Sequence, residues 1–413
     1  MCDRPNFSGA GLDMETTRDS LRSQFGRRLR LGFVGGGRDS VIGGTHLVAS
    51  RVDGFYDLVA GVFSADPHVS KATAKAELVN PSRVYESFSK MAEQEAKRED
   101  GIDVVLIATP PDIHYAASKI FLERGIDVIC EKPMTVDRKQ ALALNELVSQ
   151  NDRLFCLTHC YTGYPMVREA RSIVRLGALG KIRILEAELA AGDPGVSVEP
   201  DDPSKRHWRF RDDIMGKGAI LGEVSSHAHH LLHYIYGEEI SEVSAELSIF
   251  VPRRIVYDNA YVTLRYANGA RGRIWGSYVA AGNDHGLRFR IFGEKGSLTW
   301  DQETPEVLWL KPIGKEAVRI ARGYDDLSFE ATKATRFRPG HPEGYALAFA
   351  NLYSDFGCAV IARNLGLPCR QFLEYIPNTT DGLVTLSLIE AAVASYDREG
   401  RWTPVLQSGE GII

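Results

Sequence analysis

The sequence predicts a protein of two domains, a doubly wound parallel α/β sheet followed by an α+β domain with a large, mainly antiparallel sheet. The chain has 413 residues, more than one ordinary core accommodates. Short apolar strands alternate with helical patterns over about residues 29–158, as a parallel sheet requires. Beyond them, longer strands with period-two patterning are joined by hairpin turns. We expect residues 1–27 to be a flexible tail, 28–158 the first domain and 159–413 the second.

Composition excludes several classes of protein. Hydrophobic residues make up 44% and charged residues 25% of the chain, as in globular proteins. The net charge of −5 gives no reason to expect nucleic acid or an anionic membrane as a partner. No apolar run approaches the length of a membrane span, and the amino end lacks the apolar core of a signal peptide. The six cysteines lack the dense spacing of a secreted framework, so we expect a cytoplasmic protein.

A glycine-rich turn follows the first predicted strand, Leu29–Val34. Its first and third glycines match the start of the dinucleotide-binding fingerprint, where they make a tight turn and let the backbone approach a pyrophosphate. A serine stands where the third fingerprint glycine is expected, and the helical pattern begins only near Thr45, so the helix start is displaced or the loop is long. The phosphates would still meet backbone N–H groups at a helix N-terminus. The candidate cofactor contacts of this turn are Gly35, Gly36, Gly37, Ser40 and Gly43.

The second strand, Tyr56–Phe63, follows the helix as a βαβ unit requires. At the end of this strand an acidic side chain normally binds the adenosine ribose hydroxyls. Ser64 occupies that position here, and Asp66 lies two residues further on. No adjacent arginine is present to pair with a 2′-phosphate. We expect NAD or NADP as the cofactor, with NAD slightly favoured, and include Ser64 and Asp66 among its contacts.

The third strand, Asp103–Ala108, is nearly all apolar and ends in the loop Thr109-Pro110-Pro111. The two prolines stop the strand and turn the chain across the edge of the sheet. Asp112 is placed to cap the helix that follows. His114 is expected at the same edge, where it either satisfies a loop carbonyl or contacts a nicotinamide.

The fourth strand, Asp127–Cys130, runs directly into Glu131-Lys132-Pro133. Pro133 has no N–H group for a ladder, so the strand must stop, and it favours an extended backbone at Lys132. The ammonium group therefore lies at the carboxyl end of a strand, where ligands bind in open α/β sheets. The alternative is an ordinary surface lysine before a turn. A helix capped by Asp137 and a fifth strand, Leu154–Thr158, complete the predicted parallel sheet.

The pattern changes in the second domain. After a helix over Pro165–Leu176, strands with alternating polar and apolar residues are predicted over Ile182–Ala190, Glu242–Phe250, Asn259–Tyr266, Ala270–Tyr278 and Leu287–Phe292. The turns at Asn268-Gly269 and at Gly293–Gly296 have hairpin chemistry. We expect one face of this sheet to be apolar enough to pack on another subunit, giving a homodimer or homotetramer.

A histidine-rich segment lies between the first two of these strands. If it is helical throughout, Glu223, His227 and His230 share one face, because they are four and three residues apart. Gly237 is expected to end this helix.

Three interpretations of this segment are open. The histidines cap and satisfy a helix end, or His229 and His233 bind a metal with i, i+4 spacing, although no cysteine or acidic cluster completes the shell. In the third, a histidine oriented by a carboxylate takes the proton of a substrate hydroxyl, and a lysine stabilises the alkoxide that develops.

Taken in order, the motifs resemble those of the Gfo/Idh/MocA oxidoreductase family. They are the glycine-rich turn, Thr109-Pro110-Pro111 with His114, Glu131-Lys132-Pro133, and a Gly–acid–x–small–x–His segment ending at His227. The resemblance runs from about Arg28 to the carboxyl end. Within the family, the sequence is similar to a branch described as inositol dehydrogenase-like. The resemblance implies a Rossmann domain that binds NAD(P), a second domain for substrate binding and oligomerisation, and hydride transfer between nicotinamide and a hydroxyl-bearing carbon of a cyclic polyol or sugar.

The resemblance also implies roles for particular residues. Lys132 and His227 are the catalytic pair, with Glu223 orienting His227, although the family usually has Asp and Gly where this chain has Glu223 and Ser225. Further cofactor contacts implied are Thr109, Pro110, Pro111, His114, Glu131 and Lys132. The candidate contacts to a substrate between the domains are Tyr161, Tyr164, Trp208, Arg209, His230 and His341, of which the tyrosines and Trp208 are alternatively interdomain core. No resident metal is expected.

Two other functions remain open at this stage. NAD-retaining glycoside hydrolases have a similar fold and would form product without net NADH. A non-catalytic nucleotide-sensing subunit would bind NAD(P)H without turning over any polyol, and Glu223 and Ser225 are the departures that allow it.

Overall fold

The computed structural model describes residues 18–192 and 198–407. These residues form two compact units, which we describe separately. The parallel-sheet unit comprises residues 18–163 and Tyr345–Leu383, and the antiparallel-sheet unit comprises residues Tyr164–Gly344 and 384–407. Most of the expected tail, residues 1–17, lies outside the described part of the chain.

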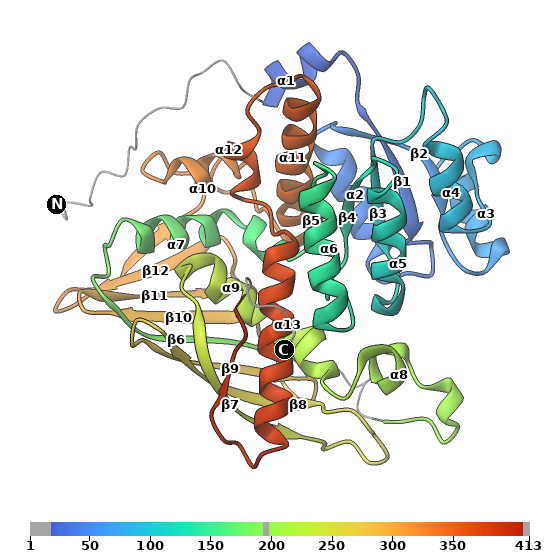
Figure 1. Cartoon of the computed structure of the whole chain (residues 1–413). Coiled ribbons are helices and arrows are strands. Elements are labelled where there is room, and N and C mark those ends of the chain that lie inside the picture. The colour runs from blue at the N-terminus through green and yellow to red at the C-terminus, as the bar shows by residue number, and fades with distance from the viewer. Residues whose placement is uncertain (1–17, 193–197, 408–413) are drawn as a thin grey trace. The chain divides into compact units, whose positions relative to one another are not determined.

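The parallel-sheet unit contains five parallel strands in the order β2-β1-β3-β4-β5 (Figure 1). They are β1 (Leu29–Gly35), β2 (Tyr56–Val62), β3 (Val104–Ala108), β4 (Asp127–Cys130) and β5 (Phe155–Leu157). All residues of the three strands β3, β4 and β5 are buried, as predicted for a sheet covered on both faces. The chain leaves β1 to one side for β2 and later returns to the other side for β3, so the topological switch point lies between β1 and β3.

Helices cover both faces of this sheet, because right-handed crossovers place α2 on one face and α4, α5 and α6 on the other. Asp137 caps α6 as predicted, its carboxylate accepting the Gln140 N–H at 2.8 Å. The predicted cap at Asp112 is wrong: α5 begins at Pro111, so Asp112 lies inside the first turn, and proline is favoured at the first helical position. The helices of the unit are α1 (Arg18–Phe25), α2 (Gly43–Val52), α3 (Pro67–Ala76), η1 (Pro81–Arg83), α4 (Phe88–Glu95), α5 (Pro111–Leu122), α6 (Arg138–Gln150), η2 (Cys160–Gly163), α11 (Tyr345–Asn364) and α12 (Arg370–Leu373).

Two segments of this unit differ from expectation. Helix α1, expected to be part of the tail, is anchored by the buried Leu21 and by an Arg18–Asp355 ion pair at 3.4 Å. Helix α11, expected in the second domain, packs against α2, and its Arg363 pairs with Asp127 through two contacts of 2.7 and 2.6 Å. In the described part of the chain, α11 is the one helix long and apolar enough to cross a membrane. Its apolar window is 83% buried, as in a core helix.

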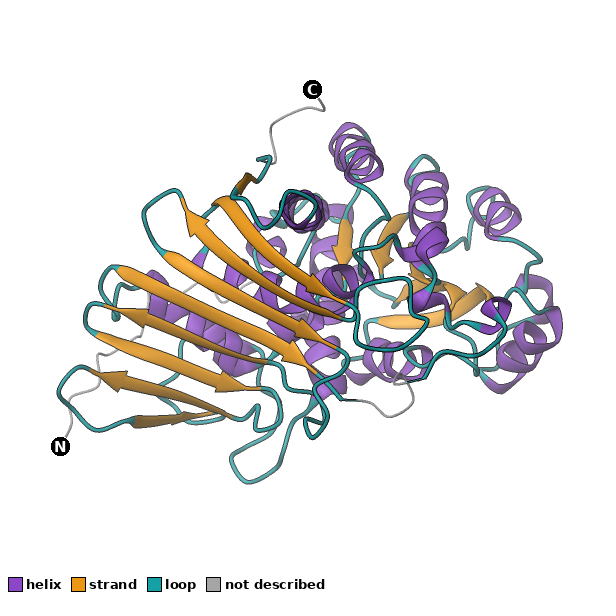
Figure 2. Ribbon diagram, turned by 90° about the horizontal axis from the view of Figure 1, so that it is seen from below, coloured by secondary structure: helices purple, strands orange, loops and turns teal. Residues whose placement is uncertain are grey.

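The antiparallel-sheet unit is built on nine strands in the order β13-β12-β11-β10-β6-β9-β8-β7-β14 (Figure 2). Every neighbouring pair is antiparallel except β6 and β9, so the predicted sheet type is confirmed. The strands are β6 (Ile182–Ala190), β7 (Ile240–Ser248), β8 (Asn259–Tyr266), β9 (Arg271–Ser277), β10 (Arg288–Gly293), β11 (Gly296–Asp301), β12 (Val307–Pro312), β13 (Val318–Ala321) and β14 (Thr403–Pro404).

One face of this sheet is covered by helices α7 and α9, and burial alternates along the strands accordingly. Gly237, with a positive φ of 76°, ends α9 as predicted. The helical elements are α7 (Pro165–Arg175), η4 (Pro203–Lys205), η5 (Trp208–Phe210), α8 (Asp212–Met215), η6 (Leu221–Ser225), α9 (Ser226–Tyr236), α10 (Phe329–Lys333) and α13 (Thr379–Tyr396), whose residues from Val384 onward belong to this unit.

Candidate active site

The glycine turn after β1 has the geometry of a dinucleotide-binding loop. Gly35 and Gly36 have positive φ angles of 78° and 69°, which a residue without Cβ adopts readily. A Cβ on Gly37 would lie 2.6 Å from the Phe63 carbonyl oxygen. A Cβ on Gly43 would lie 2.6 Å from the Gly36 carbonyl carbon, so this glycine provides the close approach of helix and loop that the third fingerprint glycine provides elsewhere.

Helix α2 therefore starts at Gly43, and Ser40 does not take the place of the third fingerprint glycine. The Ser40 hydroxyl accepts the Gly43 N–H at 3.2 Å inside the loop. The residue preceding the helix, Ile42, makes no side-chain capping bond, and the first turn carries no acidic residue. Backbone N–H groups and the positive end of the helix dipole are thus the features that α2 presents at its start, and these fit a pyrophosphate.

The two polar residues after β2 are engaged with the start of α3. The Asp66 carboxylate caps this helix by accepting the His68 N–H at 2.7 Å. The Ser64 hydroxyl accepts the Asp66 N–H at 3.2 Å. Asp66 therefore has a structural role that the sequence analysis did not foresee, and Ser64 remains the candidate for the ribose position.

The loop Thr109-Pro110-Pro111 follows β3 directly, and His114 lies behind it. The His114 ring is fully buried, with Nδ1 2.8 Å from the Pro133 carbonyl oxygen and Nε2 2.8 Å from the Thr109 carbonyl oxygen. Burial lowers the pKa of His114, although the two carbonyls act in the opposite direction. This geometry supports the interpretation in which the buried His114 satisfies a loop carbonyl and lies between the two loops, rather than a nicotinamide contact.

Lys132 lies at the same edge of the sheet as the glycine turn. Gly35 pairs with Ala108 across β1 and β3, and Ile107 pairs with Cys130 across β3 and β4. The three loops that follow these strands are therefore neighbours at the switch point. Lys132 is half-buried, in a loop that leaves β4 through Glu131. The structure thus brings together the predicted cofactor residues of these three loops.

The carboxylate of Glu131 is buried inside this unit, where His46 on α2, Thr158 after β5 and Tyr353 on α11 form one hydrogen-bonded chain with it. The sequence analysis missed all three partners. The only sequence signal was a polar histidine one residue after the Gly-Gly-Thr start of α2. Burial favours a raised pKa for Glu131, but the hydrogen bonds from His46 and Thr158 and the positive charge of Lys132 hold it below its ordinary value.

In the antiparallel-sheet unit, the histidine-rich segment is helical but not uniformly so. Residues Leu221–Ser225 form a π turn, and the α-helix begins at Ser226. A π turn holds one residue more than an α turn, so Glu223 and His227 still lie about one turn apart; single π turns are frequent at functional sites. Both side chains are buried, with His227 7% exposed.

Glu223 is also paired with an arginine that the sequence analysis assigned to the substrate. Arg209 Nε lies 2.7 Å from Glu223 Oε2, and the Arg209 guanidinium stacks over the Trp208 ring at 4.3 Å. Burial lowers the pKa of the neighbouring His207, and the Arg209 charge acts in the same direction. The three predicted residues Trp208, Arg209 and Glu223 therefore form one group in this unit.

The other substrate candidates differ in exposure. His341 is exposed, and its carbonyl accepts a 2.6 Å bond from Arg322. His230 is buried, with its ring 6.3 Å from that of Tyr234. Tyr164 is buried against Trp300 in the antiparallel-sheet unit, and Tyr161 is buried beside Tyr345 in the parallel-sheet unit, which supports a core role for both.

The metal interpretation finds no support in the described residues, which contain no group of three or more potential ligands. His229 Nδ1 lies 3.2 Å from the Thr385 hydroxyl, and its ring stacks on His233 at 5.9 Å. These contacts lie within the antiparallel-sheet unit.

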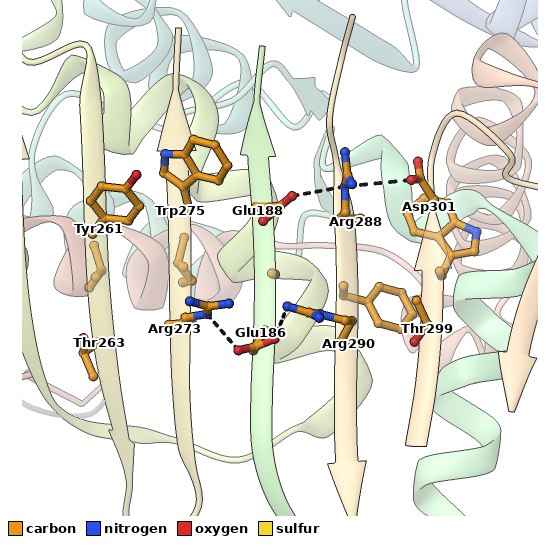
Figure 3. A pocket seen from close by; sticks show the side chains of 15 residues that line it. Glu186, Glu188, Tyr261, Thr263, Arg273, Trp275, Arg288, Arg290, Thr299 and Asp301 are labelled. Atoms are coloured by element: carbon orange, nitrogen blue, oxygen red, sulfur yellow. Dashed lines mark ion pairs between the residues drawn. The ribbon is translucent and has the colours of Figure 1, made fainter. Parts of the chain in front are cut away.

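The sheet face opposite α7 and α9 is hollowed between β8 and β11 and is mixed, whereas an apolar face was expected. Figure 3 shows Arg273 and Arg290 reaching Glu186 from the two neighbouring strands. Next to them, the Tyr261 and Trp275 rings stack at 5.8 Å. Successive side chains of a strand point to opposite faces of the sheet. The apolar side chains of these strands face α7 and α9, and charged and aromatic side chains occupy the other face.

Comparison with known proteins agrees with this geometry. Residues 29–159 match a model described as oxidoreductase family, NAD-binding Rossmann fold, and residues 167–299 match the GFO/IDH/MocA C-terminal domain. The uncharacterized oxidoreductase YfiI of Bacillus subtilis is 31% identical over 382 residues, covering 91% of this chain and 96% of that protein.

Two solved structures of an inositol dehydrogenase homolog from Azotobacter vinelandii are also similar. The complex with NAD+ has a TM-score of 0.87 and 33% identity, covering 92% of this chain and 97% of that chain. The complex with NADH and myo-inositol has a TM-score of 0.85 and 34% identity, covering 92% and 98%. The chain therefore belongs to the Gfo/Idh/MocA family of oxidoreductases, and its first domain is an NAD-binding Rossmann fold.

Proposed function

We propose that this oxidoreductase is a dehydrogenase that acts on a hydroxyl-bearing carbon of a cyclic polyol or sugar, with inositols as the first class of substrate to test. The observation that carries the proposal is the position of Lys132, two residues after the end of β4, at the edge of the sheet where the glycine turn lies. An ammonium group at that edge suits an oxygen that becomes negatively charged as its carbon gives up hydride. The similarity to a structure with NADH and myo-inositol supports this class of substrate.

The proposed roles follow from the chemistry of each side chain. Lys132 holds the reacting oxygen and stabilises its developing charge, and His227 accepts the proton of the hydroxyl. Glu223 orients His227 while bonded to Arg209, and Arg209 and His341 are the preferred substrate contacts. Bound nicotinamide supplies the hydride acceptor. Gly35–Gly37, Gly43, Ser64 and Thr109 form the proposed cofactor contacts.

A lysine pair tests the proposal. Lys132→Met should lower kcat with an inositol or hexose by about 10²–10⁴-fold, because charge stabilisation and proton handling at the oxygen are both lost. NADH affinity, measured by fluorescence titration, should change little. The matched control is Lys139→Met, which removes the same charge from an exposed position on α6 and should leave kcat unchanged. Normal turnover by the Lys132 variant would end the assignment.

The same assays separate the two rival functions. Product formed from a glycoside without net NADH would identify an NAD-retaining hydrolase. NADH binding without turnover of any inositol, hexose or glycoside would identify a nucleotide-sensing subunit.

We also propose that the chain forms a homodimer or homotetramer through the mixed face of the nine-stranded sheet. Its acidic strand β6 lies between arginines of β9 and β10, so the face combines both charges with exposed aromatic rings. Arg290→Glu should reduce the mass measured by light scattering, and Arg51→Glu, on the other unit, should not. The cytoplasm is the proposed location, since the five cysteines in the described residues form no disulfide.

A further inference from the structure

The side chain of Glu131 is held by three donors from the parallel-sheet unit. Oε1 accepts a bond from His46 Nε2 at 3.1 Å and a shorter one from the Thr158 hydroxyl. Oε2 accepts the backbone N–H of Lys132 at 3.2 Å. The residue is only 9% exposed. The carboxylate therefore ties the start of the Lys132 loop to α2 and to the end of β5.

The histidine in this chain is itself fixed. His46 is fully buried, and its Nδ1 lies 2.9 Å from the Tyr353 hydroxyl. Because the carboxylate accepts only, Nε2 must carry a hydrogen, and Nδ1 can then accept the hydrogen of the tyrosine hydroxyl. Tyr353, His46 and Glu131 thus form a chain in which every bond has a donor and an acceptor without a charge on the ring.

The titratable groups around this carboxylate are otherwise uncharged. Burial raises the pKa of the thiols and phenols that face it from β4, β5, η2 and α11, and burial lowers the pKa of His114 on α5. The raised groups are Cys130, Cys156, Cys160, Tyr345 and Tyr353. These neighbours of Glu131 are neutral. The charge of the Glu131 carboxylate therefore acts most directly on His46 and Lys132.

We propose that Glu131 is the positioning residue of Lys132: held by His46 and Thr158, its carboxylate accepts the Lys132 backbone N–H, fixes the start of the lysine's loop and places a negative charge beside the ammonium. The inference rests on the function proposed above. It differs from the role implied by resemblance, in which Glu131 contacts the cofactor, and it is argued from the bonds that both carboxylate oxygens accept from the protein itself. The Tyr353–His46 contact is the outer support of the same chain.

Amine labelling tests this without any substrate. Trace acetylation of the full chain over a range of pH, read by mass spectrometry, gives the pH at which Lys132 becomes reactive. Arg138 separates Lys132 from Lys139, so a tryptic digest reports the two lysines on different peptides. In Glu131→Gln the Lys132 curve should move to lower pH by about one unit, because the ammonium loses a neighbouring negative charge. The curve of Lys139 should stay in place.

Kinetics give the second readout. With a substrate, Glu131→Gln should lower kcat about tenfold, move the alkaline limb of the kcat/KM profile to lower pH, and leave NADH affinity within about twofold. Thr158→Val removes one donor but keeps the charge, so kcat should fall a few-fold while the labelling curve remains that of wild type. If Glu131→Gln folds poorly, an unchanged kcat in Thr158→Val overturns the inference.

The outcomes are distinct from those of the proposed function. If no polyol is turned over, the proposed function fails, and the labelling curve still decides the role of Glu131. A Glu131→Gln curve that superimposes on wild type overturns the inference. Weakened NADH binding with an unchanged curve overturns it in favour of a cofactor contact.

Discussion

Replacing Gly43 by alanine tests the assignment of this residue as the third glycine of the dinucleotide turn. The added Cβ would lie 2.6 Å from the Gly36 carbonyl carbon, closer than the 3.0 Å below which real Cβ atoms are essentially absent. An ordinary contact begins at 3.4 Å, so the loop and α2 must separate by at least about 0.8 Å. Both partners are backbone, so no flexible side chain absorbs the change.

The expected cost follows from that displacement. Overpacking of this kind costs about 1–3 kcal/mol, and each kcal/mol lowers Tm by about 2–4 °C in a domain of this size. The same shift moves the N–H groups at the start of α2 away from the phosphates, so we expect NADH to bind at least about tenfold more weakly, or 1.4 kcal/mol. Fluorescence titration with NADH and thermal unfolding measure the two effects.

The neighbouring Gly44 provides a matched control. It lies in the same first turn of α2, but a Cβ there would meet no atom within 4 Å. Gly44→Ala should therefore stabilise the protein by about 0.4–1 kcal/mol, through the loss of freedom in the unfolded chain, and leave NADH affinity unchanged. Equal NADH affinities in the two alanine variants would refute the assignment of Gly43.

Two further predictions concern stability. Arg363→Ala leaves the Asp127 carboxylate, which is 1% exposed, without its bidentate partner, and should lower the free energy of unfolding in urea by about 3–5 kcal/mol. The control Arg370→Ala, at an exposed position on α12, should lower it little. Equal losses in the two variants would contradict the anchoring role of α11. The folded pKa of Glu131 is lowered from 4.5, so its contribution to stability is complete above that pH and is lost as pH falls through the folded value. Wild type should therefore lose unfolding free energy below about pH 4.5 more steeply than Glu131→Gln, and parallel losses would show that this carboxylate is not the source.

Much of the fold follows from local pattern. The five apolar strands, the hairpins at Asn268-Gly269 and after β10, and the cap at Asp137 each depend on residues close in sequence, and the structure has all of them. Strands β11, β12 and β13 were not individually predicted. Helix α11 was also missed. Its apolar residues are spread around all sides of the helix, so no polar face repeats with the helical period of about 3.6 residues.

The candidate site divides in the same way. Glu131-Lys132-Pro133 and Thr109-Pro110-Pro111 were recognisable because each motif is contiguous and follows an apolar strand. The caps at Asp66 and before α5 could not be recognised from the sequence. Whether such a residue is a cap, a first-turn residue or a ligand depends on where the helix starts, and the sequence leaves that start uncertain by one or two residues.

The order of neighbouring residues was enough to predict the alternation of strands and helices, the edge of the sheet at which Lys132 lies, and the family resemblance. These features depend on residues close in sequence and on the rule that the carboxyl ends of parallel strands lie at one edge of the sheet. Tertiary structure alone decided which glycine meets the loop, that residues 345–383 return to the parallel-sheet unit, and that His46, Thr158 and Tyr353 gather around Glu131. Those contacts join residues up to about three hundred positions apart, and packing rather than propensity selects such partners.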